Sequence, residues 1–226
     1  APERKDLAEE KRVELHLHTK MSSMDGLVDI EDLMKQLAKW GHSAVAITDH
    51  GVVQAFPEAH EVAVKYGIKV IFGVEGYLTD EIKPKAGNNK NRSRSYHIII
   101  LAKNQTGLQN LYRLVSISHL ENYYRRPRLA REKIQQFRDG LILGTACEAG
   151  ELIQAYLRGE PQAVLEEIAS FYDFIEIQPT GNNEFLIRNG QIPSLDGLQD
   201  MNRCLLAIGE KLGKPVVATG DVHFLN

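Results

Sequence analysis

Metal-binding residue types occur in pairs at the ends of two short apolar runs. His16 and His18 end the first run, and Asp221 and His223 repeat that spacing just after the last run. Residues i and i+2 of a strand share a face, so each pair directs both side chains to one side. Histidine and aspartate are common ligands of divalent metals. The two pairs therefore predict a metal site.

Other residues of the same types follow the intervening runs. Asp49 and His50 come directly after one run, Glu75 lies late in the next, and Cys147 follows a later one. A single Asp in such a place is usually a helix N-cap, and a single His is usually a hydrogen-bonded structural residue. Their repeated occurrence at strand ends favours the metal interpretation, because parallel α/β folds build their sites at the carboxyl ends of strands.

The elements that must position these side chains alternate between β-rich runs and amphipathic stretches. Seven strands are predicted at Val13–His18, Ala44–Thr48, Lys69–Leu78, Tyr96–Ala102, Leu141–Ala146, Phe174–Gln178 and Val216–Thr219. Helical periodicity between most of them indicates a parallel α/β architecture. The link between the third and fourth runs has no helical pattern, so these two strands are expected to pair antiparallel.

Composition narrows the class of protein. The 226 residues are 43% hydrophobic and 25% charged, which is typical of a globular domain and excludes disorder. The net charge of −3 argues against nucleic-acid binding by bulk charge. Cys147 and Cys204 suit a reducing, cytoplasmic compartment without a disulfide partner. The chain has no apolar run long enough for a membrane span and lacks an initiator Met, so we expect a piece of a larger cytoplasmic protein.

Several segments resemble the PHP (polymerase and histidinol phosphatase) family. The first are Glu14–Thr19, Ser23–Gly26 and Ile47–Gly51. A second set resembles the PHP domain of bacterial C-family replicative DNA polymerases (DNA polymerase III alpha subunits) of the PolC type: Phe72–Tyr77, Tyr96–Ala102, Thr106–Leu111, Gly144–Cys147, Gly150–Glu151 and Val217–His223. The likeness extends over about residues 10 to 226.

The resemblance implies a fold and a ligand set. The fold would be a distorted (β/α)7 TIM-like barrel with its metal site at the C-terminal strand ends, formed by a single PHP domain over residues 1–226 after a tail at residues 1–10. Three divalent ions are implied, zinc or manganese first and iron or magnesium second. Their implied ligands are His16, His18, Glu75 and Asp221 for the first metal, Glu75, His97 and Cys147 for the second, and Asp25, His50 and His223 for the third.

The resemblance also implies metal-dependent phosphodiester hydrolysis, a 3′–5′ exonuclease that proofreads a DNA 3′ end beside the polymerase portion of the parent chain. Glu75, Asp221 and Asp49 are the expected catalytic residues, Asp49 as a partner of a ligating histidine. Two alternatives stay open. One is a catalytically silent domain that its metals stabilise and that supports the polymerase; the other is a small-molecule phosphatase of the histidinol-phosphate type.

One departure from the PolC pattern concerns the segment between Glu75 and His97. Polymerases of this type usually carry a proofreading exonuclease domain there, whereas this chain has only a short basic loop at residues 79–95. Residues 83–94 hold five cations and no acid. That loop, and the arginines Arg125, Arg126, Arg128 and Arg131, are candidate contacts to a DNA backbone, although a run of charges is more often solvated surface.

Overall fold

The computed structural model describes residues 8–80 and 94–225. Most of the expected tail and of the expected basic loop therefore lies outside the described residues. Within these two ranges, no helix has the length and apolar character needed to cross a membrane. Cys147 and Cys204 carry free thiols.

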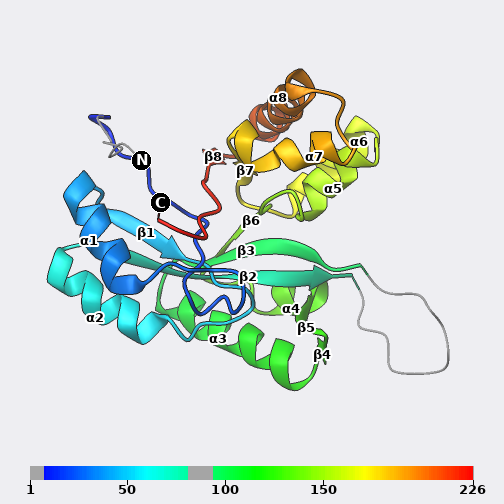
Figure 1. Cartoon of the computed structure of the whole chain (residues 1–226). Coiled ribbons are helices and arrows are strands. Elements are labelled where there is room, and N and C mark those ends of the chain that lie inside the picture. The colour runs from blue at the N-terminus through cyan, green and yellow to red at the C-terminus, as the bar shows by residue number, and fades with distance from the viewer. Residues whose placement is uncertain (1–7, 81–93, 226) are drawn as a thin grey trace.

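The chain has a mixed α/β fold with one six-stranded and one two-stranded sheet (Figure 1). The larger sheet has the order β4-β5-β2-β3-β6, with β1 paired to β2, and β7 pairs with β8 in parallel. The strands are β1 Ala44–Ile47, β2 Lys69–Thr79, β3 Tyr96–Ala102, β4 Tyr123–Tyr124, β5 Arg126–Ala130, β6 Leu141–Gly144, β7 Ile175–Ile177 and β8 Val216–Ala218.

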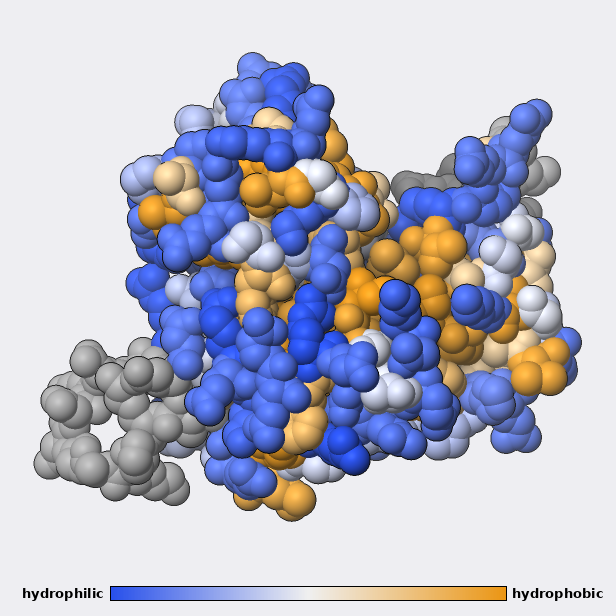
Figure 2. Space-filling view, turned by 180° about the vertical axis from the view of Figure 1, so that it is seen from behind, coloured by the Kyte–Doolittle hydropathy of each residue, from blue (hydrophilic) through white to orange (hydrophobic). Residues whose placement is uncertain are grey.

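Helices flank the larger sheet and form a second group around β7. Figure 1 shows α1 and α2 along one side of the larger sheet, α3 and α4 beneath it, and α5 to α8 together above it. The helices are α1 Ile30–Trp40, α2 Phe56–Tyr66, α3 Gln105–Leu120, α4 Arg131–Gln136, α5 Glu151–Leu157, α6 Gln162–Ser170, α7 Glu184–Arg188 and α8 Leu195–Leu212, with a 3-10 turn at Thr180–Asn183. Hydrophobic surface lies between the upper helices and the rest of the molecule in the opposite view (Figure 2).

Helix α1 illustrates how the sequence sets the bounds of an element. The Asp29 side chain caps the helix by accepting from the backbone N–H groups of Glu31 and Asp32. Gly41 ends it in a left-handed conformation with φ of 77° that glycine adopts without strain. The buried face between these two signals faces the main hydrophobic core, as the 3.6-residue spacing predicts.

Antiparallel pairing of β2 with β3 brings a late part of the chain back to Glu75. The register pairs Glu75 with Ile99 and Tyr77 with His97, so Glu75, Tyr77 and His97 share one face of the sheet. This pairing confirms the expectation drawn from the helix-free link. It also explains how His97, which begins a strand, reaches a site otherwise built at strand carboxyl ends.

The expected barrel is not formed as one continuous sheet. Regular ladders end at β1 and β6, and single bridges join Glu14 to Val45, Leu17 to Val222, and Gly144 to Phe174. The strand expected at Val13–His18 is therefore not a regular ladder. Side chains take two of its backbone donors: the Leu17 N–H donates to Thr48 Oγ1, and the His16 N–H donates to Glu14 Oε1.

A second break lies between β6 and β7, where the Phe174 ring packs directly against Gly144. A Cβ atom added at Gly144 would lie 2.1 Å from Phe174 Cζ, so only glycine fits there. The backbone N–H groups of Asp173 and Phe174 both donate to the Leu143 carbonyl oxygen, and the Asp173 carboxylate accepts from the Leu143 N–H. A single bridge replaces a ladder at this position.

We expect Gly144→Ala to destabilise the fold by about 1–3 kcal/mol, because the new methyl group overlaps the Phe174 ring and must displace it. Urea unfolding followed by circular dichroism measures the change. Gly181→Ala is the matched control, since an added Cβ at Gly181 meets no atom within 4 Å. Equal unfolding midpoints for the two variants would contradict the packing argument.

Candidate metal centre

Four donor atoms from three separate parts of the chain converge at the centre of the site. They are Nε2 of His16, Nε2 of His18, Oε2 of Glu75 and Oδ1 of Asp221, and their measured separations run from 3.1 to 3.7 Å. Four ligands of a tetrahedral ion at bond lengths of about 2.0–2.1 Å would lie about 3.3 Å apart. The donor set therefore has the dimensions of a tetrahedral metal site.

Glu176 fixes the orientation of the His16 ring. The Nδ1 atom of His16 lies 2.8 Å from Glu176 Oε1, and the same oxygen accepts from Gln178 Nε2 and Thr219 Oγ1. An ionised Glu176 accepts from a proton on Nδ1, which leaves the Nε2 lone pair facing the cluster. Sequence reasoning missed Glu176, although a charged residue in the middle of an apolar strand was the signal available.

Ser22 and Asp49 hold the His18 ring in the same way. Ser22 Oγ donates to Asp49 Oδ1 at 2.7 Å, which leaves that hydroxyl as the acceptor for His18 Nδ1 at 3.0 Å. The remaining Asp49 contacts are to the backbone N–H and hydroxyl of Thr19. Asp49 is therefore fully buried and acts on His18 through Ser22, and its carboxylate does not reach the other donors.

A second group of donors surrounds the other oxygen of Glu75. Oε1 of Glu75 contacts Nδ1 of His97 and lies 3.8 Å from Sγ of Cys147, and that sulfur is 3.5 Å from Nδ1 of His97. Glu148, which follows Cys147, and Asp221 form a further potential ligand group with the thiol. Sequence reasoning missed Glu148; its only signal was its place beside Cys147. Glu75 thus connects two adjacent groups through its two oxygens.

The third group lies at the solvent side of the site. Oδ2 of Asp25 is 2.7 Å from Nε2 of His50 and 3.3 Å from Nε2 of His223. The Asp25 side chain is 56% exposed, whereas the Glu75 side chain is 1% exposed. Nδ1 of His50 lies 2.7 Å from Oε2 of Glu75, so this outer group adjoins the buried ones.

The charges of the site are strongly coupled. Burial alone raises the pKa of Glu75, but the facing His97 and His16 rings outweigh burial and hold that pKa well below its usual range. Burial likewise opposes ionisation of Asp221, yet the neighbouring His16 lowers its pKa to about 2. Burial and the Glu75 carboxylate raise the pKa of Cys147 well above its ordinary value, so its thiolate needs a nearby cation.

Unsatisfied atoms in the cluster show that the residues fit a bound metal. Among the described residues, Oε2 of Glu75, Oδ1 of Asp221 and Nδ1 of His50 are buried without a hydrogen-bond partner. The short contact between His50 Nδ1 and Glu75 Oε2 does not count as one, because it lacks hydrogen-bonding geometry. Buried polar atoms without partners are costly. Cations bound among these atoms would accept their lone pairs, and divalent ions match the donor types.

Backbone strain accumulates around the same residues. Non-glycine residues with positive φ within the described ranges are Met24, Arg125, Ala146 and Asp221. Asp221 is itself a candidate ligand, and Met24 and Ala146 directly precede the candidate ligands Asp25 and Cys147. Such conformations cost on the order of 1–3 kcal/mol each and cluster at functional sites.

The structure brings the nine candidate ligands into one connected cluster. Each lies within 3.8 Å of another candidate through a measured contact between donor atoms: His16, His18, Asp25, His50, Glu75, His97, Cys147, Asp221 and His223.

Arg131, a candidate contact to a DNA backbone, lies outside this cluster. Its guanidinium pairs with Glu151 and Asp80 and lies over the Phe171 ring, so its contacts are internal.

Comparison with curated proteins finds relatives named DNA polymerase III PolC-type. The relative from Clostridium perfringens is 32% identical, and the match covers 99% of this chain and 29% of that protein. The relative from Bacillus subtilis is 26% identical, with 96% and 28% covered. This chain therefore spans less than a third of their length. The first alignment runs over 416 positions against 226 residues here, so about 190 positions of that relative have no counterpart in this chain.

Solved structures with the same fold include two distant proteins. One, from Bifidobacterium adolescentis, is assigned as a metal-dependent phosphoesterase by prediction; it has a TM-score of 0.56 at 15% identity, covering 94% of this chain and 87% of that one. An amidohydrolase from Chromobacterium violaceum has a TM-score of 0.54 at 13% identity, covering 93% and 87%. The model of the PHP domain family matches residues 14–180. The chain belongs to the PHP domain family, and proteins named DNA polymerase III PolC-type are its relatives over nearly its whole length.

Proposed function

We propose that this chain is a metal-dependent phosphodiesterase that removes nucleotides from a DNA 3′ end, a 3′–5′ proofreading exonuclease. The observation that carries the proposal is the set of three adjoining donor groups connected by the two oxygens of Glu75. Sites with neighbouring metal ions are typical of enzymes that hydrolyse phosphate esters.

The proposed ligand assignment follows the three groups. His16, His18, Glu75 and Asp221 would hold one ion, Glu75, His97 and Cys147 a second, and Asp25, His50 and His223 a third. The soft thiolate of Cys147 favours zinc at its position, whereas the groups of imidazole and carboxylate also suit manganese, iron or magnesium. Bound divalent ions would activate a water molecule and neutralise phosphate charge.

The residues of the chain have distinct roles in this proposal. Glu75 and Asp221 keep two ionised carboxylates in a buried place, which prepares the site for positive charge and for an anionic substrate. Glu176 and the Asp49–Ser22 pair keep the Nε2 atoms of His16 and His18 directed inward. Asp25 lies at the exposed side, where a phosphate would enter.

The proposal includes a larger protein around this domain. We infer that the relatives' additional positions enter between β2 and β3, since residues 79–95 form the basic connection at that point of the sequence. A polymerase portion of the parent chain would then be the partner of this single PHP domain in the cytoplasm. Three of the single bridges join the N-terminal segment to β1 and to the residues after β8, and β6 to the residue before β7. They support the further proposal that this segment forms a distorted barrel of seven strands together with β1, β2, β3, β6, β7 and β8.

The activity is tested on the chain after metal removal and addition of manganese. We expect metal-dependent shortening of a 5′-labelled primer from its 3′ end on a denaturing gel. Asp25→Asn should lower the rate by about a hundredfold or more, because it removes a charge from the exposed metal group. The melting temperature of the metal-free chain should stay nearly unchanged, since the side chain is largely exposed.

Asp200→Asn is the matched control, an exposed aspartate on α8 that should keep full activity. A primer that stays intact with metals added would contradict the proposal and favour the metal-stabilised structural alternative. Turnover of a small phosphate monoester without action on DNA would favour the phosphatase alternative.

A second prediction concerns the ring that Glu176 orients. Glu176→Gln should weaken metal binding about 10- to 100-fold, because the amide cannot accept the Nδ1 proton with the strength of a carboxylate. Competition against a chelating dye measures the affinity. Glu184→Gln, an exposed glutamate on α7, is the control. Unchanged affinity in Glu176→Gln would show that the Glu176 contact does not control His16.

A further inference from the structure

A short hairpin beside the metal centre presents adjacent aromatic and cationic side chains. We name it the Tyr-Arg hairpin; it consists of β4 and β5, residues 123–130, with Arg125 at its turn. Tyr123 is 57% exposed and Tyr124 is 51% exposed. The guanidinium groups of Arg125 and Arg128 lie 5.7 and 5.4 Å from the centre of the Tyr124 ring. The exposed side chains of the hairpin thus form a surface with both ring faces and positive charge.

The Tyr-Arg hairpin packs against the loop that carries His50. Gly51 has a φ of 65°, and an added Cβ there would lie 2.5 Å from Pro127 Cγ, so the hairpin packs directly against this loop. The Arg126 guanidinium lies 5.0 Å from the centre of the Tyr77 ring. A continuous row of side chains therefore runs from Arg126 toward the metal centre.

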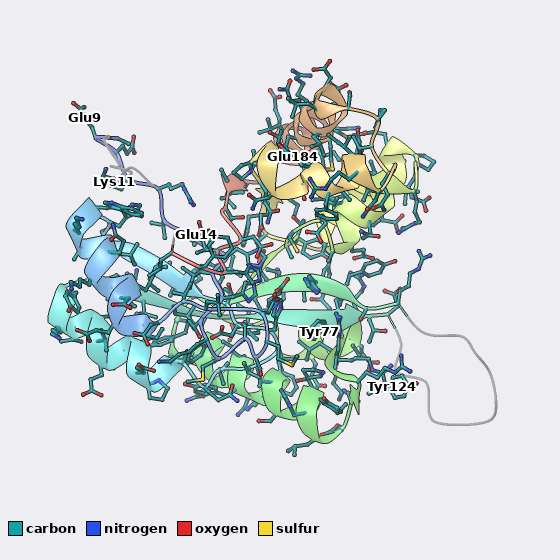
Figure 3. All side chains as sticks on the ribbon, in the orientation of Figure 1. Glu9, Lys11, Glu14, Tyr77, Tyr124 and Glu184 are labelled. Atoms are coloured by element: carbon teal, nitrogen blue, oxygen red, sulfur yellow. The ribbon has the colours of Figure 1, made fainter. Side chains whose placement is uncertain are left out.

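The Tyr77 ring connects this row to two candidate ligands. Its centre is 6.3 Å from that of the His50 ring in a stacked orientation and 5.3 Å from that of the His97 ring in an edge contact. Figure 3 labels Tyr77 near the middle of the molecule and Tyr124 farther toward the end of the sheet at which β2 ends and β3 begins. The two tyrosines mark the ends of a path between the metal centre and the outer surface.

Two arginines of this surface, Arg125 and Arg126, have no carboxylate partner in the part of the chain that the structure describes. Within residues 8–80 and 94–225, no ion pair involves Arg125 or Arg126, whereas Arg131 is paired with Glu151. An unpaired guanidinium over an aromatic ring is available to a phosphate. This local positive charge contrasts with the net charge of −3 of the whole chain.

Arg125 also occupies a strained place. Its φ is 62°, a left-handed conformation in which glycine or asparagine would be relaxed. The arginine side chain at this turn therefore comes with an unfavourable backbone conformation. Strain of this kind is characteristic of residues with a functional role.

We propose that the Tyr-Arg hairpin binds single-stranded nucleic acid and guides its end into the metal centre, an inference that rests on the proposed function. Bases would stack on Tyr123 and Tyr124, and Arg125 and Arg126 would contact backbone phosphates. Aromatic rings interleaved with cations bind single strands, because unpaired bases offer free faces for stacking. A paired duplex hides those faces, so the hairpin selects a frayed or mismatched end.

Fluorescence anisotropy of a labelled 12-nucleotide oligothymidylate, measured with the full 226-residue chain in EDTA, tests this proposal. Tyr124→Ala should weaken binding about tenfold, whereas Tyr124→Phe keeps the ring and should bind like the unmodified chain. Arg125→Gln should lower the slope of log affinity against log salt by about 0.7, the value for one lost phosphate contact. Arg203→Gln, an exposed arginine on α8, should leave the slope unchanged.

Unchanged binding in Tyr124→Ala would overturn the proposal, and so would equal affinity for a blunt duplex. Melting temperatures of all variants establish that they are folded. The two proposals fail separately. If binding depends on the hairpin but DNA is not shortened in manganese, the exonuclease proposal is wrong and this inference stands. If Tyr124→Ala changes neither the binding nor the rate of shortening, this inference is wrong and the exonuclease proposal stands.

Discussion

A buried carboxylate shared between groups of imidazoles is the constraint on which the rest of the structure depends. Glu75 is almost fully buried, and moving an isolated carboxylate into a protein interior is very unfavourable. Its Oε1 faces His97 and its Oε2 faces His18. The antiparallel β2–β3 pairing, and the return of the N-terminal segment to the centre, both bring basic nitrogen atoms to this one side chain.

The irregularity of the sheet and the order of the site have a common origin. Thr48 and Glu14 accept from backbone N–H groups at Leu17 and His16 that a regular strand would give to its neighbour. Side chains together with isolated backbone hydrogen bonds thereby hold the segment in place of a regular ladder. Its two histidine rings receive separate supports from Glu176 and Ser22. Rigid supports of this kind are what a preorganised metal site requires.

The sequence predicted most of the site because its signals are local. His16 and His18 are two residues apart, as are Asp221 and His223. Extended backbone directs such a pair to one side even where only single bridges, and no regular ladder, form. Asp25 and His97 had no comparable local signal and entered only through the family resemblance. Helix bounds such as Asp29 and Gly41 were also predictable, because capping is a local interaction.

Other features depend on contacts between distant residues and were not predictable. The strands of the Tyr-Arg hairpin lack the apolar alternation of a typical strand, and their pairing depends on β2 beside them. A distorted (β/α)7 barrel was expected, but the sheet is not closed: Phe174 packs over Gly144 and Thr48 Oγ1 accepts from the Leu17 N–H, and single bridges stand in place of ladders there. Glu176 orients the ring of His16, which is 160 positions away in the sequence, so no spacing rule identifies Glu176.

The antiparallel register of β2 and β3 has a consequence for the connection between them. Cross-strand hydrogen bonds hold Tyr77 opposite His97 and Leu78 opposite Tyr96, so the geometry of the cluster does not depend on the length of chain that joins these strands. Closing a longer connection costs only about 0.6 kcal/mol for each doubling of its length. A connection of a different length at this junction can therefore leave the arrangement of the neighbouring donor groups unchanged.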